Sequence, residues 1–245
     1  KGKVTKYVWK STLLAGTIRE YYLYVPEQYN PKETASLMVF QDGHSYANLE
    51  GDFRVPTVLD NLIYKKEIPV TIGLFVNPGH KNTELPESPY KASNRSIEYD
   101  SLNDEYVRFL IEELIPKIAE TYNLTTDRKM RIICGLSSGG ICAFTAAWER
   151  PDYFGNVISH FGSFTNIRGG HNYEAMIRKT PKKNIKVYLQ DGSNDLNNEH
   201  GNWWLANQQM ASSLEYKTYD FMFVKGDGGH NGKQGGSVFP EALKW

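Results

Sequence analysis

Gly135-Leu136-Ser137-Ser138-Gly139-Gly140 connects a short apolar run, residues 130–134, to a helical pattern that ends near Arg150. The stretch contains the pattern G-x-S-x-G between a strand and a helix. Glycines on both sides of the serine remove the Cβ atoms that would keep strand and helix apart, so the turn can be sharp and strained. The N–H groups at the start of the helix would stabilise a negatively charged oxygen there. We therefore predict that Ser137 is a nucleophile and that the backbone N–H of Ser138 donates to the oxyanion.

The rest of the chain alternates predicted strands with predicted helices. Strand patterns, the first three of them short apolar runs typical of a buried parallel sheet, occur at residues 37–41, 70–76, 130–135, 156–161, 185–190 and 219–225. Helical patterns occur at residues 57–66, 103–122, 138–150, 205–214 and 240–245. A tyrosine-rich alternating segment, residues 17–25, predicts an antiparallel hairpin with residues 6–11. The order predicts an α/β-hydrolase fold, with a mostly parallel central sheet, an antiparallel N-terminal hairpin, helices on both faces and no separate lid domain.

Two local features qualify this scheme. Residues 77–102 lack a regular pattern, contain three prolines and are too long for a plain connection. Since ligands bind at the carboxyl ends of parallel strands, we expect this segment to line the site. Pro116 should bend or divide the helix predicted at residues 103–122.

The composition narrows the classes of protein to consider. With 245 residues, 40% hydrophobic and 23% charged, we expect one globular domain over residues 1–245. The 28 basic residues are balanced by 28 acidic ones, so the chain has no excess of positive charge to hold nucleic acid. Its apolar runs are shorter than the roughly 20 residues that a membrane span needs. Neither nucleic acid nor a membrane is therefore an expected partner.

Cysteines and histidines are few and show no cofactor pattern. Cys134 and Cys142 are too few for a disulfide framework, and their redox state is open. The six histidines include no zinc motif, so we expect no metal and no other cofactor. The chain begins at Lys1 without a leader, which leaves a secreted or periplasmic bacterial location favoured and a cytoplasmic one open. The oligomeric state is open as well.

Ser137 needs a base, and the base needs a carboxylate that fixes its tautomer. In this fold the order along the chain is serine, acid, histidine. Of the histidines that follow Ser137, only His230 lies in a glycine-rich loop after a late strand, so we predict that it is the base. The turn after the strand predicted at residues 185–190 offers Asp191 and Asp195, and either could orient His230.

With these residues in place, the chain resembles the putative esterase family of α/β hydrolases. That family includes feruloyl and other plant-polysaccharide esterases, enterochelin esterases, S-formylglutathione hydrolases and mycolyltransferases. The resemblance runs through nearly the whole chain and is carried by Tyr24-Val25-Pro26, Met38-Val39-Phe40-Gln41-Asp42-Gly43, Glu112-Glu113-Leu114-Ile115-Pro116, the Gly-Leu-Ser-Ser-Gly-Gly turn, Gly192-Ser193-Asn194-Asp195 and Gly228-Gly229-His230.

The resemblance adds two roles to those argued from the residues. The family pattern G-x-x-D falls on residues 192–195, which implies Asp195 as the acid. The turn Asp42-Gly43 corresponds to the family's second oxyanion element, which implies the backbone N–H of His44 as the second donor. Ser138 departs from the family, where many relatives have Met, and this changes the wall of the pocket.

Several residues are candidates for binding substrate because they fall in segments predicted to face the site. They are Asp42, Arg95, Phe164, Trp203 and Trp204, with Tyr46 and Tyr90 as further aromatic candidates. Aromatic rings would suit a phenolic acyl group or a sugar, and Arg95 could hold a carboxylate. The alternative for each aromatic residue is packing in the core, and for Arg95 it is a solvated loop position.

The residues and the resemblance together favour a serine carboxylic ester hydrolase that forms an acyl-enzyme on Ser137. Its expected substrates are small-molecule or polysaccharide-linked esters, such as feruloyl or acetyl esters of plant xylan. The alternative within the fold is an esterase for a siderophore trilactone of the enterochelin type, because the glycine-rich ending around His230 most resembles enterochelin-esterase-like proteins. A hypothesis of another class is a non-catalytic carbohydrate-binding or accessory module.

Overall fold

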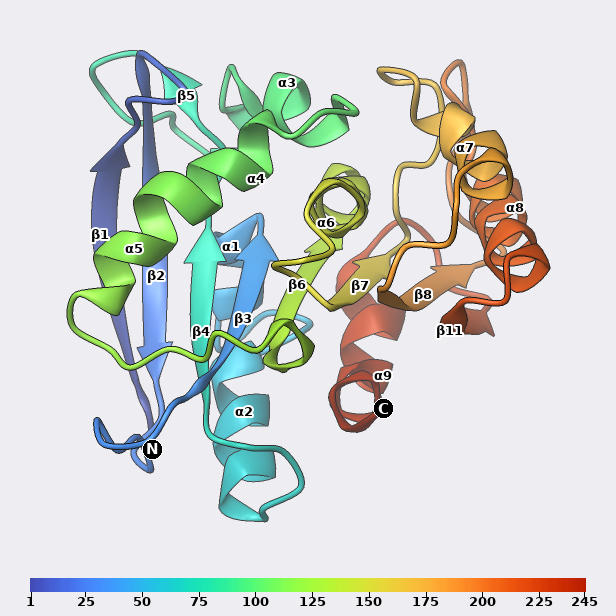
Figure 1. Ribbon diagram of the computed structural model, residues 1–245. Coiled ribbons are helices and arrows are strands. Elements are labelled where there is room, and N and C mark those ends of the chain that lie inside the picture. Colours follow the sequence, from blue (N-terminus) through green and yellow to red (C-terminus); the bar gives the residue numbers. More distant parts are fainter.

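The computed structural model describes residues 1–245 and is built around one large twisted sheet (Figure 1). The strands follow the spatial order β1-β2-β4-β3-β6-β7-β8-β11. Their bounds are β1 Lys3–Lys10, β2 Thr17–Val25, β3 Ser36–Gln41, β4 Thr71–Val76, β6 Arg131–Leu136, β7 Asn156–His160, β8 Lys186–Gly192 and β11 Asp220–Gly226, and the short β5 His80–Lys81 pairs with β2. β9 Asn197–Asn198 and β10 Gly201–Asn202 form a separate small ribbon.

The direction of the strands confirms the predicted sheet. β1 pairs antiparallel with β2, and β2 pairs antiparallel with β4. Every neighbouring pair from β4 to β11 is parallel. The carboxyl ends of these parallel strands therefore meet at one edge, where the predicted nucleophile follows β6.

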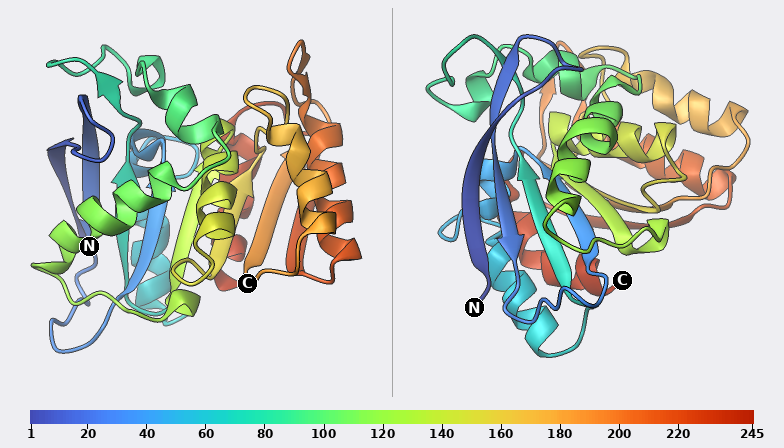
Figure 2. Two further views of the ribbon diagram at one scale, coloured as in Figure 1. Left: turned by 45° about the horizontal axis from the view of Figure 1, so that its top comes forward. Right: turned by 60° about the vertical axis from the view of Figure 1, so that its left-hand side comes forward.

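Helices cover both faces of the sheet, as Figures 1 and 2 show. One face is covered by α2 Val55–Tyr64 and α9 Gly232–Lys244, which pack on a core of 16 buried residues. The other is covered by α4 Glu105–Phe109, α5 Ile115–Ala119, α6 Ser138–Glu149, α7 Tyr173–Lys179 and α8 Trp203–Tyr216, over a core of 35 buried residues. Two short helices, α1 Gly43–Ala47 and α3 Arg95–Asp100, lie near the carboxyl ends of the strands. The prediction of an α/β-hydrolase fold with two covered faces is confirmed.

Pro116 divides the long helix predicted at residues 103–122. α4 is followed by a π-helical turn, Leu110–Leu114, and then by α5, which has Pro116 in its first turn. Proline has no N–H to donate to the preceding turn, so the helix widens there rather than continuing regularly.

The predicted start of the last helix was wrong. α9 begins at Gly232 rather than at residue 240, directly after the loop that contains His230. The Asn231 side chain caps it by accepting from the Lys233 N–H. Gly235 and Gly236 have no room for a Cβ, because they lie against His160 and the Asp52 backbone. Glycines that suggested a loop in fact allow the helix to pack closely.

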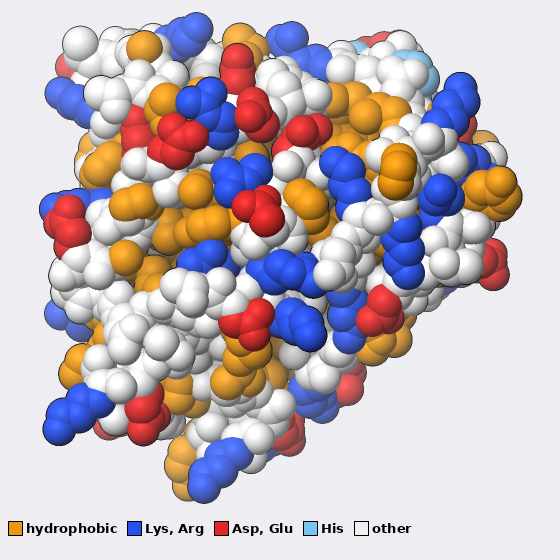
Figure 3. All heavy atoms as spheres, viewed as in Figure 1, with side chains coloured by type: hydrophobic (Ala, Val, Ile, Leu, Met, Phe, Trp, Pro, Cys, Tyr) orange, Lys and Arg blue, Asp and Glu red, His pale blue; other side chains and the backbone are white.

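The surface seen in Figure 3 has acidic and basic side chains spread over the same face. This agrees with the equal numbers of acidic and basic residues in the chain. None of the helices combines the length and the apolar character needed to cross a bilayer. The chain also has no group of three or more His, Cys, Asp or Glu side chains placed to hold a metal ion.

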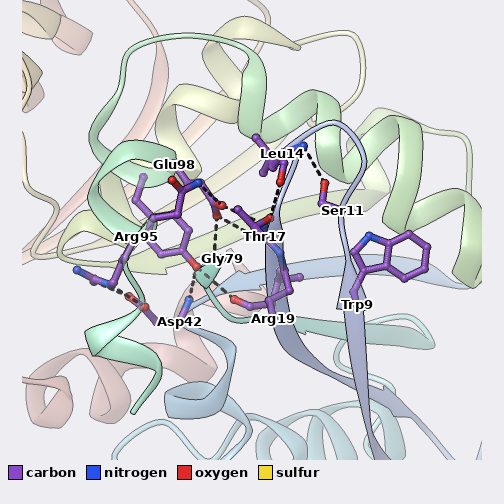
Figure 4. A network of polar contacts seen from close by, with 12 residues as sticks. Trp9, Ser11, Leu14, Thr17, Arg19, Asp42, Gly79, Arg95 and Glu98 are labelled. Atoms are coloured by element: carbon purple, nitrogen blue, oxygen red, sulfur yellow. Dashed lines mark hydrogen bonds and ion pairs between the residues drawn. The ribbon is translucent and has the colours of Figure 1, made fainter. Parts of the chain in front are cut away.

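The segment between β4 and α4 is fixed to the sheet by a buried ion pair (Figure 4). Arg19 on β2 donates to the Glu98 carboxylate on α3 at 2.7 and 2.9 Å, and neither side chain is exposed. The Gly79 N–H and the Asn94 amide donate to the same carboxylate at 3.1 and 2.8 Å. A buried ion pair needs such additional bonds to offset the loss of water. The network holds α3, and with it Arg95, beside the carboxyl ends of the strands.

Glu98→Ala should lower the free energy of unfolding by about 3–5 kcal/mol, because it leaves Arg19 buried without a counter-charge. Urea unfolding followed by circular dichroism measures the loss. As a control, the double variant Arg19→Met/Glu98→Leu removes both charges and should lose less than Glu98→Ala alone. A loss below about 1 kcal/mol for Glu98→Ala, the size of an ordinary substitution, would contradict the anchoring role of the pair.

Candidate active site

Ser137 lies on the turn between β6 and α6 and has a strained backbone. Its φ is 54° and its ψ is −123°, a conformation that L-residues rarely adopt. A Cβ on Gly135 would overlap the backbone carbonyl of Gly139, so strand and helix can approach this closely only without it. The Ser137 N–H donates to the His160 carbonyl, and the Ser137 carbonyl accepts from the Ser163 N–H, both at 3.0 Å. The turn is thus held by its surroundings in the conformation that presents the hydroxyl.

The predicted nucleophile, base and acid lie within hydrogen-bonding distance of one another. Ser137 Oγ is 2.7 Å from His230 Nε2, so the hydroxyl can donate to the ring. His230 Nδ1 is 2.6 Å from Asp195 Oδ1 and donates to it. The Asp195 side chain has no exposed surface, whereas the His230 side chain is 21% exposed and so faces the solvent side of the site. Of the two carboxylates that the residues alone left open, Asp195 is the one that contacts His230.

Glycines bring the loops that contain Asp195 and His230 together at the ends of β8 and β11. A Cβ on Gly192 would overlap the backbone of Gly228, so the two loops cross at van der Waals distance. The Asn194 N–H donates to the Gly228 carbonyl at 3.2 Å. Because each loop supports the other, the acid and the base are positioned as one unit.

Two aromatic rings pack against the imidazole of His230. The Phe161 ring centroid is 4.9 Å away and that of Trp203 is 5.7 Å away, both in edge-on arrangements. The Trp203 indole N–H donates to Ser163 Oγ at 3.1 Å, and Ser163 Oγ is 3.3 Å from Ser137 Oγ. Trp203 is only 2% exposed. It therefore packs behind His230 and supports the site. The sequence analysis had instead suggested Trp203 as an open surface for a substrate ring.

The backbone N–H of His44 is not open to an oxyanion in this structure, contrary to the role implied for it. It donates to Asn77 Oδ1 at 2.9 Å, and the His44 ring nitrogen Nδ1 is also 2.9 Å from that oxygen. Burial lowers the pKa of His44 below its ordinary value. Ser138 is the first residue of α6, and its N–H lacks an intrahelical acceptor by position. Of the two predicted donors, only Ser138 is thus available without a rearrangement.

Asp42 and Arg95 bind each other, and this removes both from the predicted set of substrate contacts. Arg95 donates to the two Asp42 oxygens at 3.0 and 2.7 Å, and the Asp42 side chain is fully buried. Burial alone would lower the pKa of Arg95, but the Asp42 carboxylate raises it above its ordinary range. Arg95 does hold a carboxylate, but the carboxylate belongs to the protein. Asp42 has a φ of 51°, so the ion pair also holds a strained turn before α1.

Three further aromatic candidates pack against other rings or lie in the core. Phe164 is 2% exposed and packs on Phe144 and Tyr173, because the turn after β7 directs it into the helical layer. Tyr46 is fully buried in the core under α2 and α9. Trp204 packs on Phe223 of β11, since consecutive helical residues point in different directions. Phe164 is thus part of the core rather than a substrate contact, whereas a substrate contact by the half-buried Trp204 stays a prediction.

The sequence reasoning missed Asn77 and Ser163, and it gave Tyr90 little weight. Asn77 directly follows β4 and Ser163 follows β7, so their positions after neighbouring parallel strands were the available signal. Tyr90 is 48% exposed and its ring lies 4.5 Å from that of His44. It is the aromatic candidate that does present a ring at the surface beside the site.

Comparisons with known proteins agree on one family. The family model described as "Putative esterase" matches residues 14–243. The chain is 25% identical over 227 residues to the uncharacterized protein YjcH of Bacillus subtilis, covering 91% of this chain and 88% of that protein. It is 22% identical over 233 residues to the iron(III) enterobactin esterase of Escherichia coli K12, covering 91% of this chain but only 52% of that protein.

Solved structures share the fold at low sequence identity. A ferulic acid esterase superposes with a TM-score of 0.79 at 18% identity, covering 100% of this chain and 97% of that one. The enterobactin esterase of Shigella flexneri, solved in the presence of enterobactin, superposes with a TM-score of 0.80 at 18% identity, covering 99% of this chain and 58% of that one. Both are esterases, and both have the same α/β architecture as this chain.

Gly135→Ala should destabilise the protein by about 3 kcal/mol or more, because the new methyl group overlaps backbone and cannot be relieved by a rotamer change. Gly229→Ala is the matched control beside His230. Its Cβ would lie 3.3 Å from the Asn194 carbonyl, a close contact that a shift of a few tenths of an ångström relieves, so we expect a loss of no more than about 1 kcal/mol. Thermal unfolding of the two variants checks the difference. Equal stability would show that the close approach of β6 and α6 is not needed.

Proposed function

Because this chain belongs to the putative esterase family, we propose that it is a serine carboxylic ester hydrolase that works through an acyl-enzyme on Ser137. His230 is the base, and Asp195 orients it. The observation that carries the proposal is the continuous hydrogen-bonded series from Ser137 Oγ through His230 to Asp195 at 2.7 and 2.6 Å. A single domain over residues 1–245 is sufficient for this site, since all three residues lie within it.

The proposed reaction follows from the positions of these atoms. Ser137 Oγ attacks the ester carbonyl while its proton moves to His230 Nε2, and Asp195 stabilises the imidazolium that results. The protonated ring then gives the proton to the departing alcohol. Water then attacks the acyl carbon while His230 Nε2 takes its proton. The bond from the acyl carbon to Ser137 Oγ breaks as the imidazolium returns that proton to Ser137 Oγ, and the acyl group leaves as a carboxylic acid. The same base therefore serves both halves of the reaction.

The negative charge that develops on the carbonyl oxygen is stabilised by hydrogen-bond donors that point at that oxygen. The Ser138 N–H at the start of α6 supplies one, helped by the positive end of the helix dipole. The His44 N–H becomes a second donor if the substrate oxygen takes the place of Asn77 Oδ1, which now accepts from it. The substrate would then exchange one acceptor for another at a site that is already built for an oxygen.

We propose esters of a phenolic acid with a carbohydrate, such as feruloyl esters of plant xylan, as the preferred substrates. Tyr90 offers an exposed ring beside His44 for the acyl group to stack on. The ferulic acid esterase that superposes with the chain over 97% of its own length supports this choice. Acetyl esters would use the same machinery without the stacking contact.

A siderophore trilactone is the second candidate, favoured by the sequence match to enterobactin esterases. The chain spans 52% of the length of these proteins, so their activity is not carried over with the match. Ferric siderophores of this type are anionic and would need free cations at the rim. Arg95, which contacts the predicted oxyanion turn through Asp42, is neutralised by that carboxylate. Because Arg95 is already paired, we place an anionic ferric siderophore below a neutral feruloyl ester as the substrate.

Ser137→Ala and His230→Ala should each lower kcat for p-nitrophenyl acetate by about 10⁴-fold or more, because either change removes the activated nucleophile. Ser193→Ala and His200→Ala place the same substitutions at exposed loop positions and should keep activity within about twofold. Retained turnover in Ser137→Ala would refute the assignment. Folded protein whose Ser137 is not labelled by a fluorophosphonate probe would instead support the non-catalytic module.

Methyl ferulate should be turned over with a kcat/KM at least about tenfold above that of ferric enterobactin, a difference of about 1.4 kcal/mol in transition-state binding. Tyr90→Ala should raise KM for methyl ferulate about 3–10-fold and leave KM for p-nitrophenyl acetate unchanged, because only the larger acyl group reaches the ring. Steady-state kinetics with the three substrates test both statements. Faster turnover of ferric enterobactin would reverse the order of the two candidates.

A further inference from the structure

A second buried carboxyl group lies beside the acid that contacts His230. Asp191 is near the end of β8 and is fully buried. One of its oxygens accepts from the Gly192 N–H at 2.7 Å, and the other is 3.0 Å from the Asn207 amide nitrogen. That nitrogen is also 3.0 Å from the Gly162 carbonyl and 3.1 Å from the Trp203 carbonyl. The two N–H groups of Asn207 therefore have acceptors even without Asp191.

Asp195 has one oxygen with two donors and one with none. Its Oδ1 accepts from His230 Nδ1 and from the Leu196 N–H, both at 2.6 Å. Its Oδ2 is buried and has no hydrogen-bond partner. A buried carboxylate oxygen without a donor is costly, so a donor is to be expected there. The Asp191 carboxyl group is within hydrogen-bonding reach of Asp195 and can be that donor if it carries a proton.

Charges around Asp191 favour the protonated form. Two ionised carboxylates cannot share a buried space without strong repulsion, so one of them binds a proton. Burial, followed by the contact with Asp195, raises the pKa of Asp191 to about 8. Asp195 is the better place for the negative charge, since His230 becomes an imidazolium beside it during the proposed reaction.

The other elements packed around Asp191 offer no compensating cation in contact with it. α8 presents the neutral Asn207, and α9 presents the neutral Gln234, whose amide donates to the Asp191 backbone carbonyl. Lys225 of β11 is in register with Asp191, but its side chain is exposed and its ammonium lies over the ring of Phe223. The remaining titratable side chain, that of His230, contacts Asp195.

We propose that Asp191 is a protonated positioning residue that donates a hydrogen bond to Oδ2 of Asp195. The carboxylate that orients His230 is thereby itself oriented by a neutral acid, which fixes its plane without cancelling its charge. The inference rests on the proposed role of Asp195 and His230. It assigns a function to a buried acid that the G-x-x-D pattern does not include.

Two substitutions at Asp191 test whether Asp195 needs a hydrogen-bond donor from this position. Asp191→Asn keeps a neutral N–H donor for Asp195 Oδ2 and should keep kcat for p-nitrophenyl acetate within about threefold. Asp191→Ala removes the donor and should lower kcat by about 10–100-fold with KM unchanged, the range seen when a supporting hydrogen bond behind a functional group is lost. Equal losses in the two variants, with both folded by circular dichroism, would overturn the proposal.

A second measurement does not depend on activity. A raised pKa means that the folded protein binds the proton more tightly than the unfolded chain does. The contribution of Asp191 to stability is therefore full below the unfolded pKa of about 3.9 and is lost as the pH rises to about 8. The urea midpoint of the wild type should fall relative to that of Asp191→Asn across this range, and Asp220→Asn should follow the wild type.

Parallel urea midpoints for the wild type and Asp191→Asn at all pH values would overturn the protonation of Asp191. The proposed function can fail separately. If Ser137→Ala kept its turnover while the midpoints diverged as expected, the esterase mechanism would be refuted and the proton on Asp191 would stand.

Discussion

The close approach of β6 and α6 determines where the nucleophile lies and so where the rest of the site must be built. Gly135 lies so near the backbone of Gly139 that a Cβ on Gly135 would overlap it. Ser137 must then adopt a positive φ, and its hydroxyl projects from the carboxyl end of the sheet. The cost of this strained residue is offset by the buried β6 and α6 on either side, which have little freedom to relax. A flexible loop could not hold the hydroxyl in this position.

Two other sets of contacts bring the rest of the site to that hydroxyl. The loops after β8 and β11 cross at Gly192 and Gly228, which places Asp195 and His230 as a unit. On the other side, the buried pair of Arg19 and Glu98 holds α3, so that Arg95 can neutralise Asp42 in the turn before α1 (Figure 4). In each case a buried contact, an ion pair or a close approach at glycine, holds a loop in place. The loop in turn positions the side chain that it carries.

Features that depend on neighbours in the sequence could be predicted, and those that depend on distant ones could not. The strand, the turn and the helix around Ser137 are local, and the chain order of the fold pointed to His230. The start of α9 was missed because Gly235 and Gly236 look like loop residues until Phe53 and Asp52 are seen against them. The roles of Phe164 and Arg95 were misjudged for the same reason. Only the folded chain shows that Phe164 packs on Tyr173 and that Arg95 binds Asp42.

The proposed function requires that an acyl group is transferred to one hydroxyl, that of Ser137. Acid quenching during turnover of a slowly hydrolysed feruloyl ester, followed by peptide mass mapping, tests this most directly. We expect a feruloyl mass increment confined to the peptide that contains Ser137, appearing before steady state and decaying when substrate is exhausted. Turnover without any such adduct, or an adduct on a different residue, would contradict it.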